Sequence, residues 1–181
     1  EKEYRLSKVA KVAAAMFSQE KINITYADAL DSAKFAHKDF DLLISNPPYS
    51  VKGFAETLNK AFDAYELSQK VRDKDSFNAI ECFFIERANT LLRGNAKLAI
   101  VLPSPILNKG GIYENTREIL LRNFHLIAIV ELGSATFGAT GTNTIILFAT
   151  KRETYANSND SQSFLNLSEN IAESLSFENV Y

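Results

Sequence analysis

The most informative stretch of the chain is Asp41-Leu42-Leu43-Ile44-Ser45-Asn46-Pro47-Pro48-Tyr49. Together with Phe40 just before it, the first part of this stretch forms a mostly apolar run over residues 40–45, which is typical of a strand buried in a parallel sheet. The two prolines lack a backbone N–H and have a fixed φ angle, so we expect the strand to end before them. A polar side chain and an aromatic ring therefore follow a buried strand directly, at the end where α/β sheets bind their ligands.

Helices and strands alternate on both sides of this stretch. The spacing of apolar residues predicts an amphipathic helix over residues 3–18 and a strand over residues 22–26. Downstream we expect helices over residues 54–66, 76–93 and 113–122, with Gly94 ending the second, and strands over residues 97–102, 126–132 and 144–150. The stripe of the first helix that we expect to be buried comprises Val9, Val12, Ala13, Met16 and Phe17. This order predicts an α/β fold with a mostly parallel sheet and a C-terminal antiparallel hairpin.

Composition limits the classes of protein that fit. The chain has 181 residues, 46% of them hydrophobic, which suits one globular domain, and its apolar runs are too short to span a membrane. One cysteine, Cys82, and two distant histidines suit neither a disulfide nor a zinc or haem site, so we expect an intracellular protein without a metal. The net charge of -2 argues against binding nucleic acid by bulk electrostatics. Nucleic-acid binding would depend on a local site or on another domain.

The composition changes near the C-terminus. From residue 153 to residue 163 the chain is rich in Asn, Ser, Asp and Gln, which predicts a linker or an exposed loop. We therefore divide the chain into a core, residues 1–152, and a linker with the start of a following segment, residues 153–181. The chain begins at Glu1 without an initiator methionine or a targeting segment, and we expect it to be a piece of a longer protein.

The segment after the buried strand predicts a binding site for a planar group that carries an NH2. The prolines hold the Asn46 side chain and the neighbouring carbonyl groups as a rigid row of acceptors beside the ring of Tyr49. The alternative is that Asn46 only caps a turn and Tyr49 only packs.

This segment resembles the Asn/Asp/Ser-Pro-Pro-aromatic signature of amino-methyltransferases that use S-adenosylmethionine. The chain is most similar to N6-adenine DNA methyltransferases of the gamma arrangement, such as the modification subunits of type I restriction systems and fused type II restriction-methylation enzymes. The similarity extends through about Arg152. It implies a Rossmann-like methyltransferase fold and S-adenosylmethionine as the cofactor.

The resemblance also implies roles for individual residues. Catalytic roles fall on Asn46, Pro47, Pro48 and Tyr49, and cofactor binding on Glu1, Asp28, Ala29 and Asn46. Glu1 would bind the cofactor ribose, and Asp28 and Ala29 would contact its adenine. Substrate binding falls on Tyr49, Phe137 and Lys52, with Lys109 as a further phosphate contact. The alternative interpretations are that Glu1 is an ordinary surface residue, that Asp28 only forms a turn, that Phe137 packs in the core and that the lysines are solvated surface charges.

One part of the family pattern does not occur in the chain. The family has a glycine-rich cofactor loop after its first strand, which should precede Glu1, and none of the seven glycines forms such a run. We therefore expect the N-terminal part of the domain to be missing, which leaves unpaired strand edges and an inactive isolated piece.

The implied function is methyl transfer from S-adenosylmethionine to the N6 amino group of adenine in DNA, within a restriction-modification system of the bacterial cytoplasm. The implied partners are double-stranded DNA with a flipped adenine, a specificity subunit or domain and a restriction subunit or domain. The signature is shared with enzymes that methylate a protein glutamine or a ribosomal RNA base, and these stay as alternatives. A third alternative is a piece that acts only as a structural or interaction module.

Overall fold

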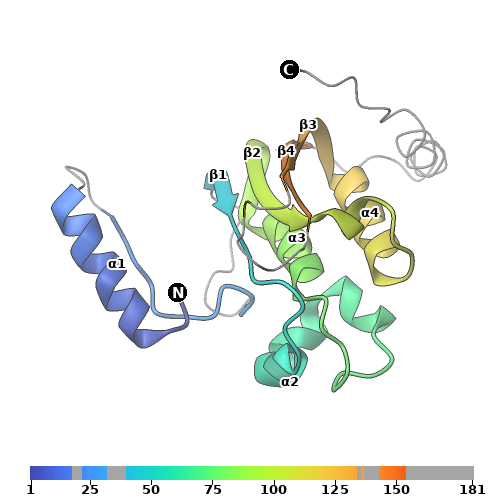
Figure 1. Ribbon diagram of the computed structural model, residues 1–181, viewed down its shortest axis with the longest axis horizontal. Helices are drawn as coiled ribbons and strands as arrows, with labels where there is room; N and C mark the ends of the chain where they lie inside the picture. Colours follow the sequence, from blue (N-terminus) through green and yellow to red (C-terminus); the bar gives the residue numbers. More distant parts are fainter. Residues whose placement is uncertain (18–21, 32–39, 134–135, 137–142, 154–181) are drawn as a thin grey trace.

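The computed structural model describes residues 1–17, 22–31, 40–133, 136 and 143–153 (Figure 1). In chain order the elements are α1 (Tyr4–Phe17), β1 (Phe40–Ser45), α2 (Phe54–Leu58), the 3-10 helices η1 (Asn59–Ala64) and η2 (Glu66–Lys70), α3 (Ile80–Leu91), β2 (Leu92–Pro103), the 3-10 helix η3 (Ser104–Leu107), α4 (Ile112–Asn123), β3 (Phe124–Leu132) and β4 (Thr144–Lys151). The predicted α/β class is confirmed. None of the helices in the described ranges is long and apolar enough to cross a membrane.

The described strands form one sheet in the order β1-β2-β4-β3. Strand β1 pairs with β2 in parallel, whereas β4 is antiparallel to both of its neighbours, β2 and β3. The predicted C-terminal hairpin is present, but the prediction of a mostly parallel sheet is wrong for these strands. The physical reason is that β4 lies between β2 and β3 and runs opposite to both of them, so both of its pairings are antiparallel.

The helices differ from their predicted bounds where the chain makes strand pairs or turns. Helix α3 ends at Leu91, and Gly94 lies inside β2 instead of ending the helix, because Leu92 already pairs with Phe40 of β1. The helix expected over residues 54–66 is divided into α2 and η1, since Asn59 has a φ of +49° and interrupts the α-helical backbone.

Helices α3 and α4 lie together against the sheet (Figure 1). Between them and the sheet is a core that includes Leu98 and Ile100 of β2 and Leu147 of β4. Where α3 meets α2, the ring of Phe83, which is 0% exposed, packs against four other rings. Those four rings belong to Phe54, Phe62, Tyr65 and Phe77. This cluster joins α3 to α2, to η1 and to the segments that contain Tyr65 and Phe77.

Helix α1 lies apart from the sheet (Figure 1). It starts where the Glu3 carboxylate accepts a hydrogen bond from the N–H of Leu6, at 2.6 Å, as expected for an N-terminal cap. The prediction that its apolar stripe is buried is wrong for the described structure, in which Phe17 is 85% exposed and Val9, Val12 and Met16 are also exposed. The expected strand over residues 22–26 does not form either.

Strand β1 is an edge strand among the described residues, where it pairs with β2 alone. Its side chains alternate between two faces. Leu43 packs against the core, whereas Leu42 and Ile44 are exposed, with Ile44 at 75%. The strand predicted from residues 40–45 is therefore confirmed, but its burial on both faces is not.

Candidate active site

The loops that could form a site meet at one edge of the sheet. Because β1 and β2 run in parallel, with Ser45 opposite Ile100, residues 46–49 leave the sheet beside the end of β2. Strand β4 begins at the same edge, where Thr144 pairs with Pro103 and the N–H of Ser104 donates to the carbonyl oxygen of Asn143, at 2.9 Å. This is the edge at which the sequence predicts ligand binding.

Asn46 and Tyr49 lie side by side at this edge. The hydroxyl of Tyr49 donates a hydrogen bond to Oδ1 of Asn46, at 3.0 Å. The Asn46 side chain is exposed and the Tyr49 side chain is half-buried, whereas Pro47 is buried and Pro48 is exposed. A carbonyl oxygen has two lone pairs, so Oδ1 can accept a second donor from the solvent side. The segment therefore presents an acceptor next to an aromatic ring.

The environment of Tyr49 keeps its hydroxyl protonated. Burial raises the pKa of Tyr49 above its ordinary value, and the nearby carboxylate of Glu81 raises it further. A neutral hydroxyl remains a hydrogen-bond donor, so the contact with Asn46 persists throughout the neutral range of pH.

The backbone directly after the signature segment is held by Glu81, a residue for which the sequence predicted no role. Glu81, in the first turn of α3, is completely buried and accepts a hydrogen bond from the N–H of Ser50 at 3.1 Å and one from the hydroxyl of Tyr113 at 2.7 Å. The signal that could have revealed it is an acidic residue inside the apolar run of residues 80–85. An acid at such a position must find hydrogen-bond donors within the fold.

The two lysines assigned to phosphate contacts are both exposed near this edge. Lys52 lies in the turn between Ser50 and α2. Nζ of Lys109 lies 5.1 Å from the ring centroid of Tyr113, a cation–π contact. Their contacts with phosphate stay predictions, as does the stacking role of Phe137, which lies outside the described residues between Thr136 and Asn143.

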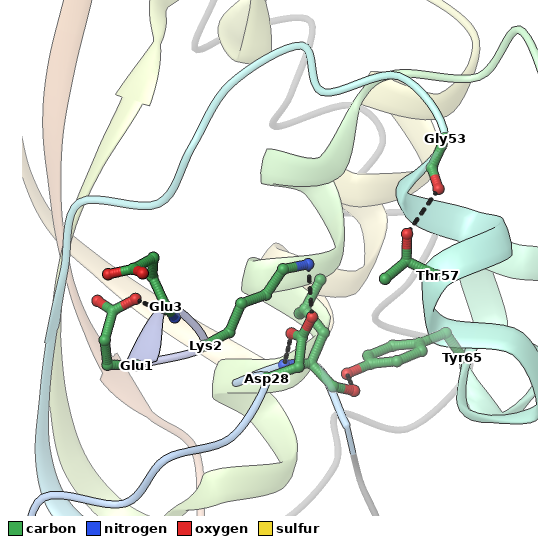
Figure 2. A network of polar contacts seen from close by, with 8 residues as sticks. Glu1, Lys2, Glu3, Asp28, Gly53, Thr57 and Tyr65 are labelled. Carbon is green, nitrogen blue, oxygen red and sulfur yellow. Dashed lines mark hydrogen bonds and ion pairs between the residues drawn. The ribbon is translucent and has the colours of Figure 1, made fainter. Parts of the chain in front are cut away.

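Three of the residues assigned to the cofactor, Glu1, Asp28 and Ala29, lie in a second cluster, whereas the fourth, Asn46, lies beside Tyr49 at the end of β1. The N–H of Ala27 donates to the carbonyl oxygen of Glu1, at 3.0 Å, which places the Glu1 backbone beside the turn that contains Asp28. Figure 2 shows Lys2 reaching Asp28, with 3.0 Å between Nζ and Oδ2. The other carboxylate oxygen of Asp28 accepts the N–H of Leu30, at 3.0 Å, so the side chain has a fixed direction.

This second cluster is tied to the core by buried side chains. Nε of Arg87 donates a hydrogen bond to the carbonyl oxygen of Ala29, at 3.0 Å. The hydroxyl of Tyr65 donates one to the carbonyl oxygen of Leu30, at 2.6 Å. Burial raises the pKa of Tyr65, so this hydroxyl also stays a donor. Helix α3 therefore holds both clusters, the first through Glu81 and the second through Arg87.

The chain resembles known proteins in both sequence and fold. The sequence matches the model of the N-6 DNA Methylase family over residues 3–179. The fold is similar to that of the EcoKI M protein of a type I restriction enzyme, with a TM-score of 0.66 and 22% identity, covering 83% of this chain and 30% of that one. A type I methyltransferase subunit from Streptococcus thermophilus gives a TM-score of 0.63 and 21% identity, covering 93% of this chain and 40% of that one.

A restriction endonuclease of type IIG, BpuSI, is also similar, with a TM-score of 0.50 and 17% identity, covering 85% of this chain and 19% of that one. The chain therefore spans less than half the length of each of these relatives. The structural likeness shows the fold, and the family match covers nearly the whole chain, which confirms the resemblance found in the sequence. The chain belongs to the N-6 DNA methylase family, a family of N6-adenine DNA methyltransferases.

Proposed function

We propose that the chain forms the adenine-binding part of a site-specific DNA methyltransferase that transfers a methyl group from S-adenosylmethionine to N6 of adenine, within a restriction-modification system. The observation that carries the proposal is the arrangement of Asn46 and Tyr49 at the end of β1. The amide of an exposed asparagine and a half-buried aromatic ring lie next to each other there, and both belong to the signature segment.

The acceptors in this segment make the amino nitrogen of adenine reactive. Its lone pair is delocalised into the ring, so it is a weak nucleophile. Hydrogen bonds from the NH2 group to Oδ1 of Asn46 and to the carbonyl oxygen of Pro47 favour a pyramidal nitrogen with a localised lone pair. The same acceptors stabilise the positive charge that develops on nitrogen, and this stabilisation is greatest in the transition state.

The ring of Tyr49 provides a surface on which the extruded base can stack. Such stacking contributes about 1–3 kcal/mol per base in proteins that bind single strands. The incoming amino group either shares Oδ1 of Asn46 with the Tyr49 hydroxyl or replaces it there. Phe137 would cover the opposite face of the base.

The residues of the second cluster fit the cofactor. When bound, S-adenosylmethionine supplies an electrophilic methyl group on its sulfonium. The Glu1 carboxylate is exposed and can accept hydrogen bonds from ribose hydroxyls. The Asp28 carboxylate is oriented by the N–H of Leu30 and by Lys2, and its remaining lone pairs can accept a hydrogen bond from the adenine of the cofactor. The neighbouring residue Ala29 can contact the same adenine.

We propose double-stranded DNA, a specificity subunit or domain and a restriction subunit or domain as the partners. The type I relatives support this proposal, and one of them comes from a study of how a type I restriction-modification system assembles. A chain with a net charge of -2 lacks the excess of basic side chains that binds DNA strongly. Most contacts with the DNA phosphates would therefore come from the partner subunits or domains. Lys52 would add a local contact.

The test is Asn46→Ala in the full-length protein, with its partner subunits where it has any. We expect methyl transfer to adenine in DNA to fall by a factor on the order of 100 to 1,000, as when one transition-state acceptor or donor is removed, with the Kd for S-adenosylmethionine nearly unchanged. Asn23→Ala, at an exposed asparagine, is the matched control. Near-normal turnover of Asn46→Ala would contradict the proposal, and transfer to a glutamine peptide or ribosomal RNA instead of DNA would reassign the substrate.

A further inference from the structure

The segment that contains Asn46 and Tyr49 is followed by a backbone turn that needs support. Ser50 has a φ of +52°, in the left-handed region, which costs a residue with a side chain roughly 1–2 kcal/mol. Its N–H points to Oε2 of Glu81, at 3.1 Å. The hydrogen bond therefore holds the turn in a conformation that serine does not favour by itself.

Glu81 joins three parts of the chain. The residue lies in α3, its Oε2 accepts the N–H of Ser50, and its Oε1 accepts the hydroxyl of Tyr113 in α4, at 2.7 Å. It is 0% exposed, so solvent cannot replace either donor. A buried carboxylate is stable only when such donors reach it, which fixes the distance between the turn and the two helices.

The position of Tyr49 depends on this turn, because Ser50 is its neighbour in the chain. The Glu81 carboxylate is also close enough to Tyr49 to raise the pKa of its hydroxyl. A shift of the Ser50 backbone would therefore move the Tyr49 ring, together with the hydrogen bond that joins it to Asn46.

We propose that Glu81 is a positioning residue that sets the geometry of Asn46 and Tyr49 for methyl transfer by holding the N–H of Ser50, with Tyr113 orienting its carboxylate. The proposal rests on the proposed function of the segment and adds to it a residue outside the signature.

Helix α3 also offers a matched comparison. The buried carboxylate of Glu86 accepts two backbone N–H groups, those of Glu66 at 2.6 Å and Leu67 at 3.0 Å. These groups belong to η2 and not to the signature segment. If buried carboxylates of α3 acted only on stability, removing either one would have the same kind of effect on the enzyme.

The experiment compares Glu81→Met with Glu86→Met in the full-length protein. Methionine keeps most of the volume and removes both acceptors. For Glu81→Met we expect kcat to fall by a factor on the order of 100, the loss that a misplacement of about 1 Å can cause, with the Kd for S-adenosylmethionine unchanged. Hydrogen exchange of the peptide covering residues 46–53 should become faster. For Glu86→Met we expect a lower Tm with nearly normal kcat and normal exchange in that peptide.

Conservative variants of Glu81 test whether kcat recovers when its hydrogen bonds are kept and stays low when they are lost. In Glu81→Gln the amide oxygen can still accept the N–H of Ser50 while its NH2 donates to the Tyr113 oxygen, so kcat should recover most of the loss. In Glu81→Asp the side chain is one CH2 shorter and cannot reach both donors, so kcat should stay low. Tyr113→Phe, which leaves the Ser50 bond in place, should reduce kcat less than Glu81→Asp.

The proposal is overturned if Glu81→Met and Glu86→Met lower kcat equally, or if exchange at residues 46–53 does not change. If Glu81→Met does not fold, equal activity of the Gln and Asp variants overturns it as well. A wild-type protein without any methyl transfer contradicts the proposed function instead, whereas the exchange measurement still tests whether Glu81 holds Ser50.

Discussion

Oδ1 of Asn46 accepts a hydrogen bond from the hydroxyl of Tyr49, at 3.0 Å, so the acceptor proposed for the target amino group already has a donor. The contact holds two residues of the signature in one orientation before a base arrives. The hydrogen bond made by the Tyr49 hydroxyl and the proposed stacking on its ring can therefore be separated by mutation.

Tyr49→Phe keeps the ring and removes the hydroxyl, whereas Tyr49→Ala removes both. We expect Tyr49→Phe to capture the flipped base as well as the wild type does, because stacking depends on the ring. Tyr49→Ala should weaken capture by about 1–3 kcal/mol. The measurement is the emission of a fluorescent adenine analogue placed at the target position in DNA. Tyr26→Ala, at an exposed tyrosine, is the control, and equal signals from the Phe and Ala variants at position 49 would remove the stacking role.

Asp28→Ala tests the cofactor cluster. Loss of an oriented carboxylate should raise the Kd for S-adenosylmethionine in the full-length protein about tenfold, the equivalent of one hydrogen bond to a charged group. Calorimetric titration measures this Kd directly.

Lys2→Met is the matched change for Asp28→Ala. It removes the partner of Asp28, but the side chain of Lys2 is exposed, and an exposed ion pair contributes only about 0–1 kcal/mol. The Kd should therefore change little. A tenfold effect of Lys2→Met, or none of Asp28→Ala, would show that the cluster does not contact the cofactor as proposed.

Phe83→Ala tests the cluster of aromatic rings around Phe83 that joins α3 to α2. Phe83 is completely buried among four rings, so truncation should lower the free energy of unfolding by about 3–5 kcal/mol. Phe17→Ala removes the same group from the exposed face of α1 and should change the free energy by no more than about 0.5 kcal/mol. Urea denaturation of the two variants gives both numbers. Similar losses would mean that α1 packs against the protein in solution.

Cys82 should not react with thiol reagents in the folded protein. Burial raises its pKa to about 12, so the thiol is neutral, and its sulfur is also inaccessible. In the unfolded chain the thiol ionises at its ordinary pKa, so this group lowers stability as the pH rises above that value. The expected result with Ellman's reagent at pH 8 is no release of colour until denaturant is added, and then one thiol per chain. Rapid reaction of the native protein would contradict the burial of Cys82.

Local signals predicted the elements well where they agreed with the tertiary structure. Two prolines after residues 40–45 placed the end of β1 correctly, because a residue without an N–H cannot continue a ladder. Gly94 failed as a helix end for the opposite reason. Pairing between β1 and β2 begins at Leu92, and these sheet hydrogen bonds outweigh the local preference of glycine for a helix end.

Long-range packing explains the remaining differences. The helical spacing in residues 3–18 gave the correct helix, but spacing cannot show whether a surface exists for the apolar face to cover. Glu81 was missed because its importance comes from Ser50, 31 positions away in the chain. The signature segment can be recognised in the sequence because its four residues are consecutive, and their catalytic roles stay predictions.

The position of β1 at the edge of the sheet has a practical consequence. Among the described residues this strand pairs on one side alone and exposes a branched side chain, Ile44, and such an edge is a template on which another extended chain can add. Two molecules of this chain that meet at β1 could pair through their backbones before any other surface engages. The yield of monomer during production should therefore fall as the protein concentration rises, and a charged residue in place of Ile44 should reduce that dependence.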